Sequence, residues 1–393
     1  MQNFHNYLSI CKKNLKLLVA TLVVATVLNV VPAGAAPAPT PAPEKNYIVV
    51  LKNNVSDSRG VASDHGKRRG AKVSNVYSHA IKGYSAKMSA SAANDTAKDA
   101  NVAYVTEDSL VHISTIQTRA TWGLDRIDQR TRTLNTRFNY VASGAKVKAY
   151  IIDTGIRTTH TDLGGRAVSG YDSIDGALPA DDCNGHGTHV AGTVGGKTYG
   201  VAKNVKLIAV RVLDCDGYGY WSQIIAGIDY VTADHKAGEP AVANMSIQGS
   251  ANDAVDAAVK NSIADGVSYA IAAGNNTMDA CQSSPARVTD AMTVGATDNT
   301  DTKASWSNYG NCVDWFAPGV NITSDWLTSD SATAVLSGTS MATPHTAGVT
   351  ALYLQRFPRA TPKQVRDAIY QLTTKNVVVG SKSVNSHLLY TNL

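Results

Sequence analysis

Three short segments carry residue types that could together perform acyl transfer by a serine. Asp153 follows the apolar run 147–152, His186 lies between two glycines, and Ser340 lies among small residues. A serine hydroxyl attacks a carbonyl when a base takes its proton and a carboxylate orients that base. The chain therefore contains a candidate carboxylate, a candidate base and a candidate nucleophile.

Ser340 stands four residues before Pro344, which indicates where a helix begins. Proline has no backbone N–H and is tolerated best in a helix's first turn. We therefore expect a helix from Thr343 to about Gln355, with Ser340 just before or at its N-terminus, where the helix dipole favours negative charge. An ordinary helix cap is the alternative, because serine and threonine are common there.

Each further candidate also has a structural alternative when taken alone. Asp153-Thr154-Gly155 fits a turn at a strand end, and His189 is a rival base that would point back into the protein from a helix. Asn275 could donate its side-chain amide to an oxyanion, together with the Ser340 N–H, or serve as a turn residue. The joint occurrence in one domain is far more specific than any single part.

The stretches around these residues alternate between strand and helix patterns. Apolar runs predict strands at 147–152, 205–213, 241–245, 267–272 and 292–296, and helical spacing or caps predict helices around 224–231, 255–263, 343–355 and after Thr361. Such alternation indicates an α/β domain with a mostly parallel sheet buried on both faces. Active sites of these sheets lie beyond the carboxyl ends of the strands, where Asp153 and Asn275 would stand.

Composition excludes several classes of protein. Of 393 residues, 44% are hydrophobic and 17% charged, which is typical of a globular chain with a core. The net charge of +5 is too small to indicate nucleic-acid binding, and the short basic run 67–72 fits a solvated loop. No nucleic-acid partner is expected.

The N-terminus reads as an export signal. Lys12, Lys13 and Lys16 precede an apolar run at 17–31, and Ala33-Gly34-Ala35 fits a cleavage site. The run is shorter than a membrane-spanning helix needs, although an uncleaved anchor is the alternative. We assign 1–35 to a signal peptide and the Pro/Ala-rich stretch 36–45 to a linker outside the fold. The mature protein is expected to be secreted and free of the membrane.

Residues 46–114 form a separate small module. Strands are expected at 47–51, 102–105 and 110–113, and 81–88 alternates between apolar and polar residues. The module has no cysteine and few residues with catalytic potential. A small α+β unit is the prediction.

Cysteine usage also fits an exported protein. The chain has five cysteines, and Cys11 leaves with the signal. The other four favour disulfides, with three connectivities open, and the absence of a C-x-x-C pair argues against zinc. The sequence-local pairing, Cys183 with Cys215 and Cys281 with Cys312, is preferred.

The three segments around Asp153, His186 and Ser340 resemble the active-site signatures of subtilisin-like serine proteases. The likeness is nearest to the proteinase K branch, particularly its aqualysin-like secreted members, and Trp122–Ile127, Ser307–Gly310 and Ala317–Gly319 also match. The chain order Asp, His, Ser is that of subtilisin. The resemblance covers about residues 115–393. It implies a sheet of about seven parallel strands flanked by helices, and a serine endopeptidase with these residues as its triad and Asn275 as oxyanion donor.

The resemblance also implies a cleft that clamps substrate as an extended strand. The matching segments are Gly217-Tyr218-Gly219 and Ser246-Ile247-Gln248-Gly249, with Ala272-Ala273-Gly274 lining the first pocket and Trp221 near the fourth subsite. Gln248 departs from the family's glycine and Ile247 from its leucine, which puts the width of the pocket in question. No acid is placed to favour a basic P1 residue, so an apolar or broad preference is expected.

Calcium is the one cofactor that the resemblance implies. The family's site would use the Asp314 carboxylate and the carbonyls of Thr289 and Ala291, and hard oxygen ligands suit Ca²⁺. A second site near Asp125, Asp128 and Gln129 looks eroded, because Asn135 and Arg137 stand at ligand positions and Arg137 would repel the ion. The family's cysteine spacing supports the local disulfide pairing.

By the same resemblance, residues 46–114 are an inhibitor-like propeptide. Such a segment acts as a folding chaperone and occupies the cleft until the enzyme cuts it, here near Ser114–Thr115. The expected partners are polypeptide substrates and this propeptide, and the mature enzyme is expected to be a monomer without a C-terminal accessory domain.

Two rival functions differ from this interpretation. An α/β-hydrolase esterase has a G-x-S-x-G elbow and the order Ser, acid, His, whereas here Ala342 ends the corresponding segment and Ser340 comes last. A catalytically silent binding protein would lack a member of the triad, and no member is missing.

Overall fold

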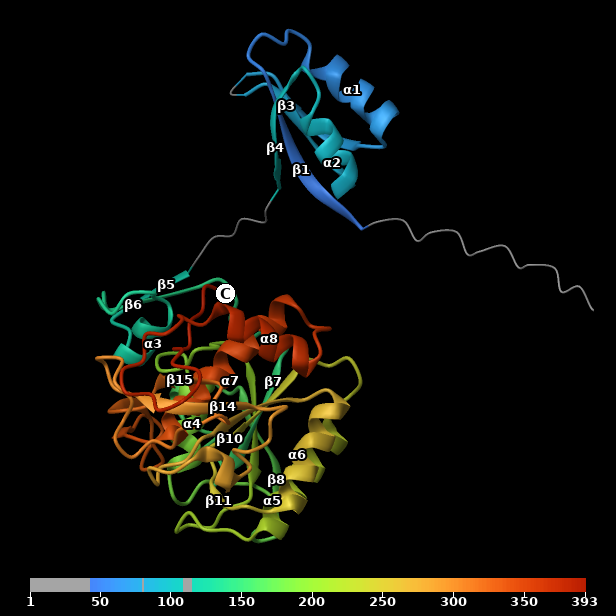
Figure 1. Ribbon diagram of the computed structural model, residues 1–393. Helices are drawn as coiled ribbons and strands as arrows, with labels where there is room; N and C mark the ends of the chain where they lie inside the picture. Colours follow the sequence, from blue (N-terminus) through green and yellow to red (C-terminus); the bar gives the residue numbers. More distant parts are fainter. Residues whose placement is uncertain (1–42, 80, 109–114) are drawn as a thin grey trace, which may run out of the picture. The chain divides into compact units, whose positions relative to one another are not determined.

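The computed structural model describes residues 43–79, 81–108 and 115–393, in two compact units that divide between residues 111 and 112 (Figure 1). The predicted signal peptide at 1–35, most of the linker, the strand at 110–113 and Ser114 lie outside the described residues. Each unit is described by itself. In the described part of the chain, no helix is long and apolar enough to cross a membrane.

The first unit is an antiparallel four-stranded sheet with two helices, as the α+β prediction requires. The strand order is β2-β3-β1-β4. Its elements are β1 (Glu44–Leu51), α1 (Ser58–Arg69), β2 (Lys72–Tyr77), β3 (Gly83–Ser89), α2 (Ala90–Ala97) and β4 (Val102–Glu107). Val49, Leu51, Tyr84 and Met88 form its core, and both helices cover one face of the sheet (Figure 1).

The first strand begins earlier than the sequence analysis expected. Glu44 and Lys45, assigned there to the linker, lie in β1, where Glu44 pairs with Ser89 of β3. Ion pairs of Glu44 with Lys72 and of Lys45 with Glu107 connect the start of β1 to β2 and β4. Pairing with β3, rather than local composition, therefore sets where the fold begins.

The second unit is built on a seven-stranded sheet in the order β15-β14-β12-β10-β7-β9-β8, in which all neighbours are parallel. Its strands are β7 (Lys148–Asp153), β8 (Ala167–Asp172), β9 (Lys206–Arg211), β10 (Ala241–Met245), β12 (Ser268–Ala272), β14 (Met292–Thr297) and β15 (Trp315–Pro318). The predicted α/β fold with about seven strands is confirmed. The five runs found in the sequence are the five inner strands.

The two edge strands, β8 and β15, were not predicted from the sequence. β8 reads Ala-Val-Ser-Gly-Tyr-Asp and is half exposed, and β15 is four residues long and ends in proline. β8 gives a weak signal because an edge strand needs less apolar surface than a central one. β15 is fully buried, but it is too short to show as an apolar run, and its proline suits an edge strand.

Helices cover both faces of this sheet (Figure 1). α4 (His186–Gly195) and α7 (Thr339–Arg356) pack on the face that carries Ala149 and Ile151 of β7, and α5 (Trp221–Asp234) and α6 (Asp253–Asp265) pack on the face that carries Tyr150 and Ile152. The alternation along β7 follows from the period of two residues in a strand. The remaining elements are α3 (Trp122–Ile127), α8 (Pro362–Leu372) and the strand pairs β5 (Thr115–Thr118) with β6 (Arg137–Tyr140), β11 (Gly249–Ser250) with β13 (Ser283–Ser284), and β16 (Ile322–Asp325) with β17 (Thr333–Leu336).

The strand order reverses direction between β7 and β10. From β7 the chain fills positions on one side, β8 and β9, and then crosses to β10 and continues outward to β15. A crevice opens beyond the carboxyl ends of the strands at such a switch point. Asp153 ends β7, and Ser246 follows β10, so both stand at this crevice.

Candidate active site

Asp153 and His186 form a hydrogen-bonded pair. Asp153 is the last residue of β7 and is fully buried, and His186 is the first residue of α4. The distance from Nδ1 of His186 to Oδ1 of Asp153 is 2.7 Å. Burial of the imidazole opposes its protonation, but the charge of Asp153 and its hydrogen bond outweigh this and raise the pKa of His186 above 6.5. The carboxylate thus holds the ring with Nε2 turned away from it.

Glycines on both sides of His186 allow this close approach. Gly185 has φ +108°, and a Cβ there would lie 2.5 Å from the Trp326 ring, while a Cβ on Gly187 would lie 2.1 Å from the Gly155 carbonyl oxygen. The start of α4 therefore packs directly against the end of β7. This packing brings His186 onto Asp153.

Asp182 is a positioning residue that the sequence analysis did not name. Its Oδ1 accepts the N–H groups of Asn184 and Gly185 at 2.9 and 2.8 Å, and its Oδ2 accepts the N–H of Thr188 at 2.9 Å. These bonds cap the loop and first turn that carry His186. An aspartate a few residues before a helix start is the only local signal for it.

Ser340 lies inside α7 rather than before it, which corrects the predicted helix start. The helix begins at Thr339, so Pro344 stands in its second turn. Pro344 cannot donate to the carbonyl of Ser340, four residues earlier. That carbonyl instead accepts the Ser246 hydroxyl at 2.9 Å, and the Ser340 hydroxyl donates to the Ser246 carbonyl at 3.3 Å. The proline is tolerated because a side chain takes the place of the missing backbone donor.

Asn275 lies beside the nucleophile with its amide orientation defined. Its Oδ1 accepts both the N–H and the hydroxyl of Thr339, each at 2.9 Å. Because both partners are donors here, the oxygen must face them, which leaves the Nδ2 group as a free donor. A further hydrogen bond fixes the start of α7, because the Thr339 hydroxyl accepts the N–H of Gly274 at 3.1 Å.

One cavity brings together most of the residues that the sequence analysis selected. Its lining includes the following of them: His186, Gly217, Tyr218, Gly219, Trp221, Ser246, Ile247, Gln248, Gly249, Ala272, Asn275 and Ser340. Two expected wall residues do not reach it: Ala273 is fully buried in a cluster with Ala280 and Phe316, and Gly274 lies beneath Gln248. Tyr220 and Ile224 line the cavity and were not predicted. Tyr220 is 79% exposed at the start of α5, a position that composition alone does not mark.

The cavity offers little charge to a substrate side chain. Among the described residues that line it, Asp216 is the carboxylate, and its side chain is exposed at the rim. His189 is not a rival base, because it is fully buried, its Nε2 lies 3.0 Å from the Ile322 carbonyl oxygen, and burial lowers its pKa to about 4. The expectation that His189 is structural fits this placement.

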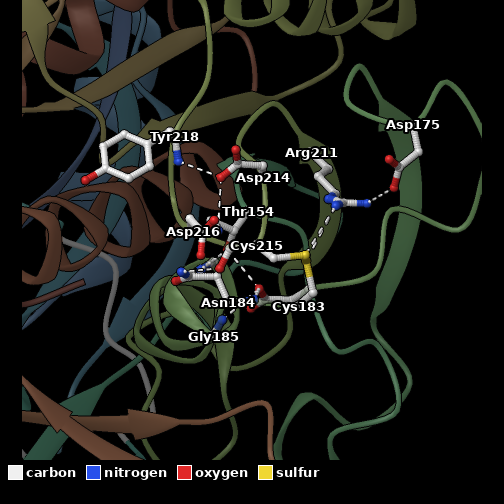
Figure 2. Close-up of a disulfide and its surroundings, with 12 residues drawn as sticks. Thr154, Asp175, Cys183, Asn184, Gly185, Arg211, Asp214, Cys215, Asp216 and Tyr218 are labelled. Atoms are coloured by element: carbon white, nitrogen blue, oxygen red, sulfur yellow. Dashed lines mark hydrogen bonds and ion pairs between the residues drawn. A yellow bond between two sulfur atoms is a disulfide. The ribbon is translucent and has the colours of Figure 1, made fainter.

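A disulfide connects the histidine loop to the substrate side of the cavity (Figure 2). Cys183 is bonded to Cys215, and the amide of Asn184 donates to the Cys215 carbonyl at 2.9 Å. Arg211 lies beside the disulfide and forms an ion pair with Asp175 at 2.6 Å. The second disulfide joins Cys281 and Cys312. Both are the preferred sequence-local pairs.

The expected calcium ligands do not fit an ion as they lie. Asp314 is buried; its Oδ2 accepts the N–H of Thr293 at 2.8 Å, and its Oδ1 forms an ion pair with the Arg366 guanidinium of α8. A cation between Asp314 and the carbonyls of Thr289 and Ala291 would be repelled by this permanent positive charge. The calcium site at Asp314 stays a prediction from the resemblance, and the Arg366 guanidinium is the group that would compete with an ion there.

The second, eroded cation site is also filled by protein donors. The two oxygens of Asp125 accept the N–H groups of Asn135 and Thr136 and the side-chain amide of Gln129. Asp128 accepts two donors from Asn139, at 2.7 and 2.6 Å. Hydrogen bonds satisfy both oxygens of Asp125 and Oδ2 of Asp128, whereas the buried Oδ1 of Asp128 has no hydrogen-bond partner among the described residues.

Comparison with known proteins decides the family. The model of the subtilase family matches residues 144–388, which include Asp153, His186 and Ser340. The chain belongs to the subtilase family. Its first unit matches a second family, peptidase inhibitor I9, over residues 46–114. The subtilase is therefore a serine protease preceded by an inhibitor-type propeptide.

Individual relatives agree with this subtilase assignment. The extracellular serine proteinase of Thermus sp. (strain Rt41A) is 53% identical over 320 residues, which cover 81% of this chain and 78% of that protein. Alkaline serine exoprotease A of Vibrio alginolyticus is 48% identical over 324 residues, covering 81% of this chain and 60% of that protein. A solved structure of a cold-adapted subtilisin-like serine proteinase superposes with a TM-score of 0.68 at 48% identity, covering 70% of this chain and 100% of that one.

Proposed function

We propose that this subtilase is a secreted endopeptidase that cleaves polypeptides through an acyl-enzyme on Ser340. The observation that carries the proposal is the 2.7 Å pair of buried Asp153 with His186, because His186 lines the same cavity as Ser340. The carboxylate orients the imidazole and stabilises its protonated form, so Nε2 can serve as the base. The α/β-hydrolase reading does not suit a chain of this family.

The reaction has two halves. In the first, the Ser340 hydroxyl leaves the Ser246 carbonyl, passes its proton to Nε2 of His186, and its oxygen bonds to the substrate carbonyl carbon. The C–N bond then breaks as His186 gives the proton to the departing amine. In the second, His186 takes a proton from water and the water oxygen bonds to the acyl carbon; the bond from that carbon to Oγ of Ser340 then breaks, His186 returns the proton to Oγ, and the acid product leaves.

Two donors meet the negative charge that develops on the substrate oxygen in each half. They are Nδ2 of Asn275 and the backbone N–H of Ser340, which the first turn of α7 leaves without a helical partner. Thr339 occupies the Asn275 oxygen, which keeps the amide nitrogen directed to the site. The donors are in place before the substrate arrives and need no rearrangement.

Substrate is proposed to bind as an extended chain between the segments 217–219 and 246–249, which line the cavity. An uncharged P1 residue is favoured, because the exposed Asp216 at the rim is the carboxylate among the described lining residues. Tyr218 is 75% exposed and lies at the edge of the cleft, where it can cover a bound peptide.

The I9 unit is proposed to act as an intramolecular chaperone and inhibitor. Its match ends at residue 114, immediately before the predicted cleavage between Ser114 and Thr115. Ser340 would cut this bond itself, after residues 1–35 have directed export. The mature enzyme is proposed to work as a monomer.

The deciding experiment compares the wild-type chain with Ser340→Ala in casein hydrolysis. We expect clear hydrolysis by the wild type, none above background by the variant, and accumulation of the variant as an uncut precursor. An organophosphonate should label wild-type Ser340 and leave the variant unlabelled. A wild-type protein that hydrolyses a short-chain ester but not casein, or that resists labelling, would contradict the proposal.

A further inference from the structure

We propose that Gln248 limits the P1 side chain to small residues by occupying the pocket beside Ser340. This inference rests on the proposed endopeptidase function and concerns its specificity. The pocket lies between the segment that contains Ser246 and Gln248 and the segment that runs from Ala272 to Asn275. The side chain next to the carbonyl that Ser340 attacks must enter this space.

The Gln248 amide bridges the two walls of the pocket. Its Oε1 accepts the backbone N–H of Asn275 at 2.9 Å. A Cβ placed on Gly274 would lie 2.5 Å from both the Cδ and the Oε1 of Gln248. The amide therefore rests directly on the backbone of the opposite wall, where the pocket floor would otherwise be open.

Gly274 makes this contact available. Its φ is +104°, a conformation that side chains rarely adopt, and its lack of a Cβ leaves the space that the amide fills. The glutamine and the glycine are complementary in shape. A glycine at position 248 would leave that space to the substrate.

The wall that carries Gln248 is fixed at both ends. Ser246 exchanges two hydrogen bonds with Ser340, and Gly249 lies against the Trp221 ring, where a Cβ would come within 2.4 Å. Gly249 also pairs with Ser284 in the small β11–β13 sheet. These contacts hold the wall in position, so a bulky P1 side chain would have to displace the amide itself.

Displacement carries a double cost. The Asn275 N–H loses its side-chain acceptor, and the glutamine must find a new position near the cleft. Alanine, glycine and serine at P1 avoid both costs. A difference of one methylene in such a pocket changes kcat/KM by roughly 10–200-fold, so phenylalanine should be disfavoured by at least about tenfold relative to alanine.

The test measures kcat/KM on the peptide series succinyl-Ala-Ala-Pro-X-p-nitroanilide with X as Ala, Leu or Phe, after mature wild type and variants are titrated with the organophosphonate. We expect wild type to favour Ala over Phe by about tenfold or more. Gln248→Gly and Gln248→Ala should each shift the Phe/Ala ratio toward Phe by about tenfold or more. A ratio cancels any general loss of activity that follows from the lost bond to Asn275.

Two further variants control for other causes. Gln248→Glu keeps the size and the acceptor, so it should still favour Ala over Phe. Gln371→Ala removes a glutamine from the exposed face of α8 and should leave every ratio at the wild-type value. A wild type that prefers Phe, or a Phe/Ala ratio that stays unchanged in both Gln248→Gly and Gln248→Ala, overturns the inference while leaving the endopeptidase function intact. Absence of both labelling and hydrolysis for every peptide overturns the function, and this inference with it.

Discussion

Asp153 and Asp314 are two buried aspartates at the ends of strands of the same sheet, and they show how a partner decides what a carboxylate does. Asp153 stands at the carboxyl end of β7 and is paired with an imidazole at 2.7 Å, whereas Asp314 precedes β15 and is paired with the guanidinium of Arg366. A histidine gains and loses a proton near neutral pH, but an arginine keeps its charge. The first pair can therefore transfer protons, and the second is a permanent tie between β15 and α8.

The largest effect is expected from a substitution that removes the charge of Asp153 but can keep a hydrogen bond to His186. Asp153→Asn should lower kcat by about 10⁴-fold, because the amide favours the wrong tautomer of His186 and no longer stabilises the imidazolium. The matched change, Asp314→Asn, should leave kcat within about twofold of wild type, since Asp314 lies away from the cavity lining. Turnover of a peptide substrate by titrated enzyme measures both. Equal losses in the two variants would contradict the division of roles.

The next effect concerns a neutral group that supports the same chemistry. Asn275→Ala should reduce kcat by roughly 10²–10³-fold, the range for loss of one oxyanion donor, which was measured in subtilisin itself, a protein of the same family. KM should change little, because this donor acts on the charge that develops in the transition state. Full activity of the variant would refute the assignment of Asn275. Asn276→Ala, the neighbouring exposed residue, is the control.

Most of the active site around Asp153 could be predicted from the sequence alone. Asp153, His186 and Ser340 stand in short motifs whose glycines and strand ends are visible locally, and the five inner strands show as apolar runs. These signals are strong because buried strands and tight loops restrict residue types over a few positions.

The ion pair of Asp314 with Arg366 could not be predicted in the same way. Arg366 lies 52 residues along the chain from Asp314 on another element, and an arginine in a helix has no distinctive pattern. The early start of α7 escaped prediction for a similar reason, since Pro344 is accommodated by Ser246, which is 94 residues from Ser340. Pairings between distant segments follow from packing and leave no local trace.

The pH dependence of activity should reveal the proton-transferring pair. His186 must be neutral to act as a base, and its pKa is raised above 6.5 because Asp153 stabilises the charged form more than burial opposes it. The profile of kcat/KM should therefore be flat above this raised pKa and fall about tenfold per pH unit below it. In Asp153→Asn the midpoint should move to lower pH. A midpoint that does not move would show that another group controls the profile.

The Asp314–Arg366 ion pair should instead contribute to the stability of the fold. Arg366→Ala leaves a buried carboxylate without its counter-charge, and we expect a loss of about 1–3 kcal/mol, between the values for surface and buried pairs. This corresponds to a decrease in Tm of about 2–4 °C per kcal/mol. Thermal unfolding of the mature Ser340→Ala protein, prepared by coexpressing the propeptide in trans, avoids autolysis during the measurement.

The sign of the pH effect on this variant follows from burial, which raises the pKa of Asp314 while Arg366 lowers it. Without the arginine, the unpaired charge destabilises the fold above the raised pKa, and protonation removes that penalty as pH falls toward the unfolded value. The Tm deficit of Arg366→Ala should thus be larger at pH 7 than at pH 5. Arg366→Lys, which keeps the charge, should show a smaller deficit at both values.

The smallest expected effect is a change in how Ca²⁺ shifts the Tm, which tests whether Arg366 takes the place of an ion. Subtilases commonly bind structural calcium, and the residues at which this chain would bind it include the carboxylate that Arg366 neutralises. Removing the guanidinium frees one oxygen of Asp314, which could then bind an ion. Millimolar Ca²⁺ should therefore raise the Tm of Arg366→Ala by more than that of the wild type, because an ion that binds only the folded state stabilises it. The double variant Arg366→Ala/Asp314→Ala should lose this extra response. An equal response to Ca²⁺ in all three proteins would mean that the ion does not bind at Asp314. Arg366 would then connect β15 and α8 without replacing a cation.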